Sequence, residues 1–286
     1  MRTHRRLRRI SVAVAVACAS ALCAVSAAAQ APRRVMSLSM CTDALALDLL
    51  PLNRIASVTF LSRDPSNSFL WPQAAKVHIN YGNAEEVLAE KPDFVLAGTY
   101  TTPATRMLIK RVGISMLEVP AANNFAEIRA TTRSVAHALG EDALGEALIA
   151  KMDATLRELA ATKPHRLIRV AGWNGGGSVP GRGTLFDAIL TAAGGVNVAV
   201  SEGEGDGSFD LEQLLQARPD VLAYGSDTSS TPSLHTEEAL HPIVLKLYAG
   251  RRITYPSALY SCGVVESAAA AVALRASLRK AMPGDT

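Results

Sequence analysis

The chain has 286 residues, of which 49% are hydrophobic and 19% charged, a composition typical of globular proteins that excludes a disordered chain. Its formal net charge is +3, but residues 1–9 contain five arginines and no acid. Removing those arginines leaves the remainder near −2, without a basic patch that would indicate nucleic-acid binding.

The N-terminal segment predicts an export signal. Residues 10–25 form an apolar run after the arginines, too short for a comfortable membrane span, and Ala27–Ala29 offers a small-residue cleavage site. We expect a signal peptide over residues 1–29 and export of the mature protein. The sequence leaves the exact cleavage site and a lipid anchor on Cys18 open.

Strand-like and helix-like runs alternate through the first half of the mature chain. The expected strands are 34–39, 55–60, 94–97 and 115–119, and the expected helices are 42–50, 84–90, 104–112 and 124–139. Such alternation favours a parallel sheet covered by helices. The same order restarts later, with strands at 167–172, 221–224 and 252–255 and helices at 185–193, 211–217 and 265–280.

Between these two halves, residues 142–163 predict one long helix. Apolar residues recur there every three or four positions, at Leu144, Leu148, Met152, Leu156 and Leu159. A helix of about 20 residues spans roughly 30 Å, enough to reach from one lobe to another. The alternative is a surface helix inside one large domain. We expect a first lobe at 32–140, the helix at 141–164 and a second lobe at 165–286.

A repeated segment links the two halves. Residues 83–96 and 210–223 each predict a capped short helix, a basic-Pro-Asp turn and a buried strand. The expected capping boxes pair Asn83 with Glu86 and Asp210 with Gln213. Glu85 and Glu212 hold equivalent positions in the first helical turn, where a carboxylate favours the helix dipole or, alternatively, meets a partner.

With these elements in place, the sequence resembles the periplasmic binding proteins for vitamin B12, haem and ferric siderophores. Residues 34–45 resemble the family's first strand and helix, and residues 83–96 resemble its N-x-E-x-(I/V)-x-x-x-K-P-D segment. Residues 183–197 are similar to its second-lobe helix and GG-x-N turn, and residues 260–278 to its last loop and helix.

The resemblance implies an α/β fold of two Rossmann-like lobes with parallel-type sheets, joined by a single long backbone helix. It also implies the substrate-binding component of an ABC importer, a monomer without a cofactor that delivers its ligand to an inner-membrane permease with its ATPase. In this family one glutamate of each lobe docks against permease arginines, and the matching residues here are Glu85 and Glu212. Catalytic motifs such as G-x-S-x-G and H-E-x-x-H do not occur, so we expect no enzyme.

Ligands of open parallel sheets bind beyond the carboxyl ends of the strands. Aromatic residues are only 5% of the chain, yet several fall at such ends, where flat side chains suit a corrin or a metal chelate. Each aromatic could instead fill the core. The expected ligand-binding residues are Met40, Cys41, Thr42, Tyr81, Tyr100, Trp173, Asn174, Tyr260 and Cys262.

The ligand stays open between a corrinoid, which we favour, and a ferric siderophore or haem. A negatively charged chelate would want arginines, for which Arg63, Arg106 and Arg182 are candidates. Cys41 and Cys262 allow a disulfide between lobes, two free thiols against the ligand, or a soft-metal site with Met40. The histidines are scattered, so we expect no bare-metal site.

Overall fold

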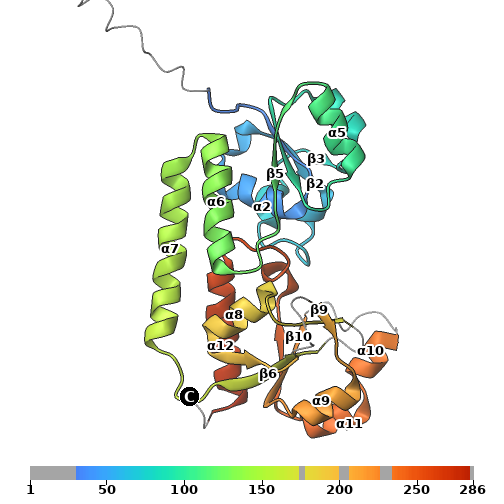
Figure 1. Cartoon of the computed structure of the whole chain (residues 1–286), viewed down its shortest axis with the longest axis vertical. Coiled ribbons are helices and arrows are strands. Elements are labelled where there is room, and N and C mark those ends of the chain that lie inside the picture. The colour runs from blue at the N-terminus through green and yellow to red at the C-terminus, as the bar shows by residue number, and fades with distance from the viewer. Residues whose placement is uncertain (1–29, 174–177, 200–205, 226–233, 284–286) are drawn as a thin grey trace, which may run out of the picture. The chain divides into compact units, whose positions relative to one another are not determined.

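The computed structural model describes residues 30–173, 178–199, 206–225 and 234–283 (Figure 1). Residues 1–29, where the export signal is expected, and Asn174 lie outside the described residues. From Pro32 onward the chain clusters as one compact unit that contains two separate parallel sheets. No helix in the described part of the chain combines the length and apolarity needed to cross a membrane.

The first lobe contains a parallel sheet with the strand order β3-β2-β1-β4-β5. The central strand β1 is buried along its whole length, because helices cover both faces of the sheet. The strands of this lobe are β1 (Val35–Ser37), β2 (Ile55–Thr59), β3 (Ile79–Asn80), β4 (Phe94–Gly98) and β5 (Ser115–Val119). Its helices are α2 (Met40–Leu49), η1 (Leu52–Arg54), η2 (Phe60–Arg63), α3 (Trp71–Ala74), α4 (Ala84–Glu90), α5 (Pro103–Arg111) and α6 (Phe125–Leu139).

One continuous helix, α7 (Asp142–Ala161), connects the lobes, as the spacing of apolar residues predicts. It runs beside α6 of the first lobe and also contacts α8 and α12 of the second (Figure 1). Ile149, Met152 and Leu159 form its buried face. The fold-class prediction of two parallel α/β lobes joined by one long helix is therefore confirmed.

The second lobe contains a parallel sheet with the strand order β11-β10-β6-β8 and a separate antiparallel pair, β7 with β9. Its strands are β6 (Ile168–Gly172), β7 (Ser178–Pro180), β8 (Gly195–Asn197), β9 (Asp206–Ser208), β10 (Val221–Gly225) and β11 (Arg252–Tyr255). Its helices are α8 (Leu185–Ala193), α9 (Leu211–Ala217), α10 (Leu234–Ala239), α11 (Pro242–Leu247), η3 (Ser257–Leu259) and α12 (Ser267–Ala281).

The sequence repeat is a structural repeat. α4 and α9 both begin with a capping box, and both end at a basic residue in the left-handed conformation, Lys91 (φ 50°) and Arg218 (φ 45°). That conformation is uncommon for residues other than glycine, so its appearance at both sites indicates two copies of one design.

The Pro-Asp turn that follows each repeat helix ties it to the central strand of its own lobe. Asp93 accepts a 2.9 Å hydrogen bond from the backbone N–H of Arg34, beside β1. Asp220 accepts a bond of the same length from the N–H of Arg169, in β6. The aspartate of the repeat is thus explained by a structural role in both lobes.

The segment before α12 forms a second connection between the lobes. Cys262 and Val264 pack into the core of the first lobe, although α12 itself packs in the second. Beside them the carboxyl groups of Asp48, in α2, and Glu266, at the start of α12, contact each other. Burial, followed by the charge of Glu266, raises the pKa of Asp48 above its usual range.

All strands and helices expected from the sequence are present, with ends displaced by at most two residues. The sequence interpretation missed the short elements, which are α3, β3, β7, β8, β9, α10, α11 and the three 3-10 turns. The residue boundaries of the lobes stay a prediction, because contacts join Pro32–Thr286 into one unit.

Candidate ligand-binding site

A pocket of about 400 Å³ is lined by residues of both lobes, a volume within the range of small-molecule sites. The first lobe contributes Ser39, Cys41, Thr42, Leu45, Gly98, Thr99, Tyr100, Val119, Pro120, Ala121, Ala122, Asn123 and Thr131. The second contributes Pro180, Thr184, Leu185, Phe186, Tyr255, Tyr260, Ser261 and Gly263.

The wall from the first lobe follows the carboxyl ends of β1, β4 and β5, as the rule for open parallel sheets requires. The end of β4 approaches the N-cap of α2 so closely that a Cβ atom on Gly98 would lie 2.1 Å from the Oγ atom of Ser39. Thr99 then accepts a hydrogen bond from the backbone N–H of Ala121, which joins the ends of β4 and β5. Close contacts among the segments that follow β1, β4 and β5 therefore form this wall.

The wall from the second lobe is aromatic. Tyr255 ends β11, Tyr260 follows η3, and Phe186 lies in the first turn of α8. The ring centroids of the two tyrosines are 4.5 Å apart, and that of Phe186 lies 5.4 Å from Tyr255 and 6.0 Å from Tyr260. Burial raises the pKa of Tyr260, so its phenol stays neutral. These three rings therefore form one aromatic cluster in the pocket lining.

The structure brings four of the expected ligand-binding residues into this pocket: Cys41, Thr42, Tyr100 and Tyr260. Tyr100 is the most open of them, with 88% of its surface exposed. Met40 follows β1 as expected but packs against the first core instead of lining the pocket. That Cys41, Thr42, Tyr100 and Tyr260 contact a ligand stays a prediction.

Two other expected residues lie elsewhere. Trp173 is fully buried in the core of the second lobe and packs edge-on against Phe209, so the structure places it away from the pocket wall. The large ring fills the space where β6 meets its covering helices. Trp173 is thus an aromatic residue at a strand end that fills the core and does not line the pocket. Tyr81 is 61% exposed and stacks with Phe60 outside the pocket lining.

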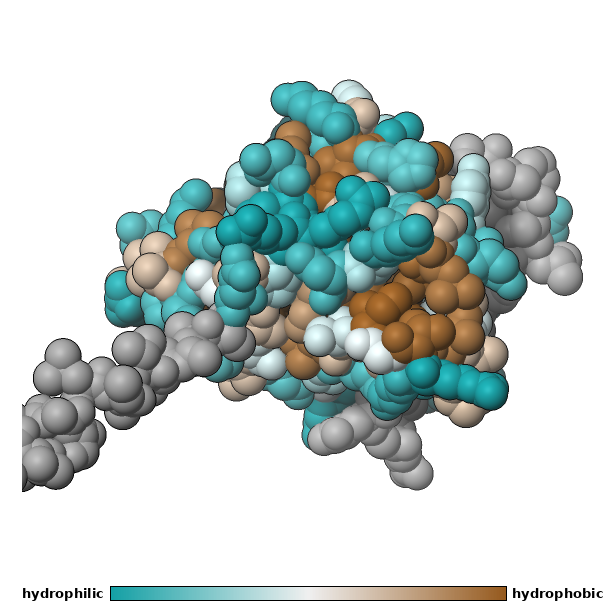
Figure 2. Space-filling view, turned by 90° about the horizontal axis from the view of Figure 1, so that it is seen from above, coloured by the Kyte–Doolittle hydropathy of each residue, from teal (hydrophilic) through white to brown (hydrophobic). Residues whose placement is uncertain are grey.

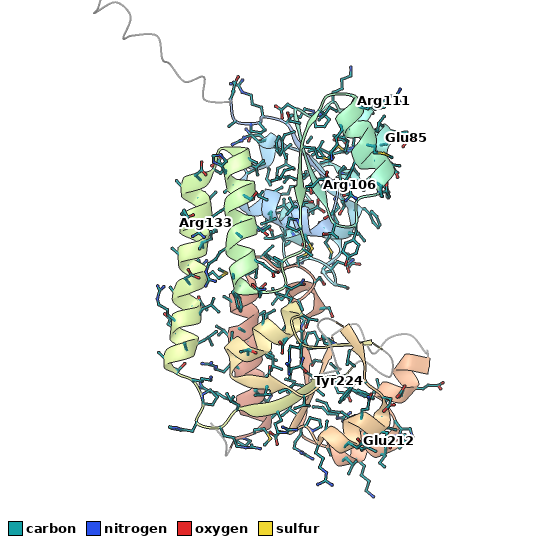
Figure 3. The ribbon with its side chains drawn as sticks, viewed as in Figure 1. Glu85, Arg106, Arg111, Arg133, Glu212 and Tyr224 are labelled. Carbon is teal, nitrogen blue, oxygen red and sulfur yellow. A yellow bond between two sulfur atoms is a disulfide. The ribbon has the colours of Figure 1, made fainter. Side chains whose placement is uncertain are left out.

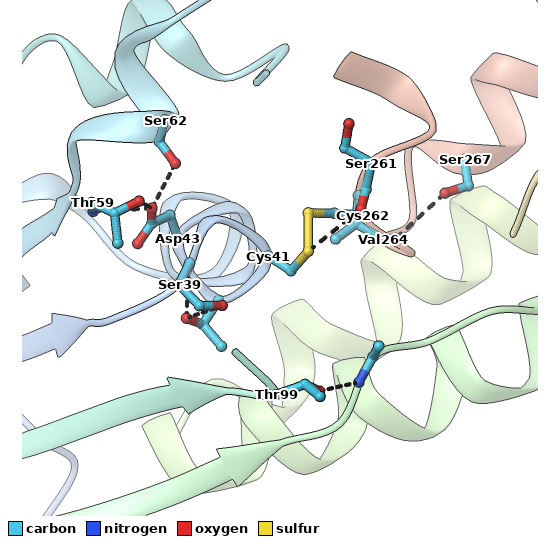
Figure 4. The surroundings of a disulfide bond; sticks show 12 residues. Ser39, Cys41, Asp43, Thr59, Ser62, Thr99, Ser261, Cys262, Val264 and Ser267 are labelled. Carbon is cyan, nitrogen blue, oxygen red and sulfur yellow. Dashed lines mark hydrogen bonds between the residues drawn. A yellow bond between two sulfur atoms is a disulfide. The ribbon is translucent and has the colours of Figure 1, made fainter. Parts of the chain in front are cut away.

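Cys41 and Cys262 form a disulfide, with Cα atoms 5.2 Å apart (Figure 4). The alternatives of two free thiols and of a soft-metal site are therefore wrong. Cys41 still lines the pocket, whereas Cys262 is buried behind it. Among the described residues no cluster of His, Cys, Asp or Glu could hold a metal ion.

Sequence reasoning missed Phe186 and Tyr255. Tyr255 carried a usable signal, because it is the last residue of an expected strand. Phe186 carried none, since its place in an apolar helix is equally typical of the core. Only the arrangement of α8 against β11 and η3 brings its ring to the pocket.

Glu85 and Glu212 are exposed at the second position of α4 and α9. Figure 3 shows one in each lobe, both on the side of the molecule away from α6 and α7. Both glutamates are therefore accessible to a partner. The end of the first lobe is largely hydrophilic, with apolar areas between polar side chains (Figure 2).

Two parallel α/β lobes, a long connecting helix and a pocket lined from both lobes define a two-lobed solute-binding protein. The chain belongs to the family described as periplasmic binding protein, whose model matches residues 73–233. Members of this family serve solute transport and are not enzymes.

Solved structures share the fold. A periplasmic haem-binding protein RhuT from Roseiflexus sp. RS-1 is 23% identical, with a TM-score of 0.68 over 87% of this chain and 98% of that one. The vitamin B12-binding protein BtuF of Vibrio cholerae is 16% identical, with a TM-score of 0.67 over 87% and 98% of the two chains. The molybdate-binding MolA of Haemophilus influenzae is 17% identical, with a TM-score of 0.68 over 88% and 86%. No curated protein matches the sequence.

Proposed function

We propose that this protein is the periplasmic substrate-binding component of an ABC importer, exported by its N-terminal signal. It binds a corrinoid between its lobes and delivers it to an inner-membrane permease. A ferric siderophore or haem is the alternative ligand of the same transport class. The similar structures name vitamin B12, haem and molybdate as ligands, so their fold supports the transport class and leaves the ligand to the pocket.

The pocket lined from both lobes is the observation that carries the proposal. It sets an aromatic wall of the second lobe against the hydroxyl groups and strand ends of the first. Aromatic faces bind flat apolar rings, and a few hydroxyl groups orient their polar edges. A corrin ring with amide side chains offers both kinds of surface.

Titration of the purified mature protein by calorimetry tests the ligand. We expect cyanocobalamin to bind with one-to-one stoichiometry, and the mutation Tyr260→Ala to weaken it by about tenfold, the loss of about 1.4 kcal/mol typical of one aromatic contact. Trp173→Phe is a matched control, because this buried ring lies away from the pocket. Binding of haemin or a ferric siderophore, with no heat from cyanocobalamin, would select the alternative ligand.

We further propose that Glu85 and Glu212 dock the two lobes onto basic residues of the permease. Their equivalent places in the repeat and their exposure support this role. Charge complementarity of this kind sets orientation and association rate more than affinity. The competing explanation is that each carboxylate only favours its helix dipole, which contributes about 0.3–1 kcal/mol.

Reversing both charges, Glu85→Lys with Glu212→Lys, is expected to reduce ligand uptake by cells at least about tenfold, because two like-charged contacts would replace two attractive ones. Ligand affinity of the purified variant should stay unchanged, since neither residue lines the pocket. Glu158→Lys, at an exposed position of α7, is a control that shows how reversing a charge elsewhere on the surface affects uptake. Normal uptake by the double variant contradicts the docking role.

A further inference from the structure

The described lining of the pocket contains no formally charged side chain. Its polar groups are hydroxyls, such as those of Thr99, Tyr100, Thr131 and Tyr260, together with the amide of Asn123 and backbone groups. A charge buried without a partner costs several kcal/mol, because the protein must replace the water that solvated it. The lining therefore stabilises hydrogen-bonding and apolar surfaces much better than ionised ones.

The three arginines that could have served a charged ligand are placed elsewhere. Arg63 donates hydrogen bonds to backbone carbonyls near α3. Arg106 forms an ion pair with Glu118, 3.6 Å away. Arg182 lines a separate pocket of about 210 Å³ in the second lobe. None of them is part of the lining of the larger pocket.

Two helices begin at the pocket, α2 and α8, and a helix N-terminus can substitute for a cation. Here each helix carries its own carboxyl group in the first turn, Asp43 in α2 and Asp187 in α8. The backbone N–H of Asp187 donates to the hydroxyl of Thr184, which caps α8. A carboxyl group in each first turn offsets the positive end of its helix dipole.

Asp43 is fully buried and accepts hydrogen bonds from Thr59 and Ser62 (Figure 4). Burial raises its pKa to about 7, and the hydrogen bonds oppose that rise. Its carboxyl group adds no positive charge to the start of α2.

We propose that the pocket selects ligands whose buried face is electroneutral, such as a corrinoid with intact amides or an uncharged metal chelate, and discriminates against ligands that bury a carboxylate or a highly anionic chelate. This selection rests on the proposed binding function and names the ligand chemistry of the same pocket. It separates the candidates by charge: an intact corrinoid and a neutral ferric trihydroxamate fit, whereas haem with free propionates and a ferric tricatecholate do not.

Matched ligand pairs test the selection with the wild-type mature protein. The pairs are cyanocobalamin with its monocarboxylic acid derivative, haemin dimethyl ester with haemin, and a ferric trihydroxamate with a ferric tricatecholate. In each pair that binds, we expect the neutral member to bind at least about thirtyfold more tightly at pH 7.5, equivalent to about 2 kcal/mol. Its affinity should change less than twofold between about 20 and 500 mM salt, because screening acts on charged contacts.

The possible outcomes are distinguishable. A charged member that binds as tightly as its neutral partner, or more tightly, overturns the selection and leaves the binding function standing. If no member of any pair binds, the proposed function fails and the selection fails with it. A preference for neutral members that disappears in high salt also overturns the selection, because it would then arise from distant surface charge.

A pair of variants at Tyr100 provides a second measurement. Tyr100→Arg places a cation at the exposed rim of the pocket, and Tyr100→Gln removes the same ring without adding charge. Relative to the glutamine variant, the arginine variant should bind the charged member of a pair about tenfold more tightly and leave the neutral member within about twofold. Equal affinities of the two variants for the charged member would show that charge in the lining does not set selectivity.

Discussion

Reduction of the Cys41–Cys262 disulfide is expected to lower the free energy of unfolding by about 3–5 kcal/mol. The bond joins residues separated by 221 positions, so it closes nearly the whole mature chain into one loop and restricts the unfolded state strongly. It also fixes the start of α2 to the segment before α12, at the connection between the lobes.

Guanidinium unfolding of the wild-type protein with and without a phosphine reductant measures the effect. The double variant Cys41→Ala with Cys262→Ala should match the reduced wild type to within about 1 kcal/mol and show no response to reductant. Equal stability of the oxidised and reduced wild type contradicts a stabilising disulfide. Because Cys41 lines the pocket, ligand affinity measured on the same samples shows whether the bond also maintains the pocket.

Arg275→Met is expected to lower the free energy of unfolding by about 3 kcal/mol. The guanidinium of Arg275 is buried and donates to the backbone carbonyls of Ala192 and Ala193, at the end of α8. It also donates to the carbonyls of Leu159 and Thr162, at the end of α7. Removing it leaves the final carbonyls of two helices without these donors and takes a positive charge from their negative dipole ends.

Two variants separate this effect from a general loss of charge on α12. Arg279→Met changes an exposed arginine one turn further along the same helix and should alter stability by less than about 0.5 kcal/mol. Arg275→Lys keeps the charge but lacks the planar fork of donors, so it should recover only part of the loss. If Arg275→Met unfolds at the same denaturant concentration as the wild type, the carbonyls have found other donors.

Secondary structure was predictable here because the local signals agree with each other. The capping residues Asn83 and Asp210 and the prolines Pro92 and Pro219 bound their helices from both sides, and those helix ranges match the structure residue by residue. The missed elements are short: α3 has four residues and β3 has two. Sequences of this length cannot show a periodicity of apolar residues.

The pocket was predictable in part. The rule that ligands bind at the carboxyl ends of parallel strands predicted Cys41, Thr42, Tyr100 and Tyr260 as ligand-binding residues, and all four line one pocket. The same rule does not tell which way a side chain at a strand end points, and Trp173 points into the core. Periodicity along one strand cannot resolve this, because strands of buried parallel sheets are apolar on both faces.

By itself, the sequence determined two repeated α/β halves, the long helix between them and the family resemblance, since caps, turns and apolar spacing act between residues close in the chain. Only the tertiary structure decided that Cys41 pairs with Cys262, that Arg275 completes the ends of two helices, and that the described residues of the pocket lining carry no charge. These features join residues far apart in the chain, so they depend on how sheets and helices pack together.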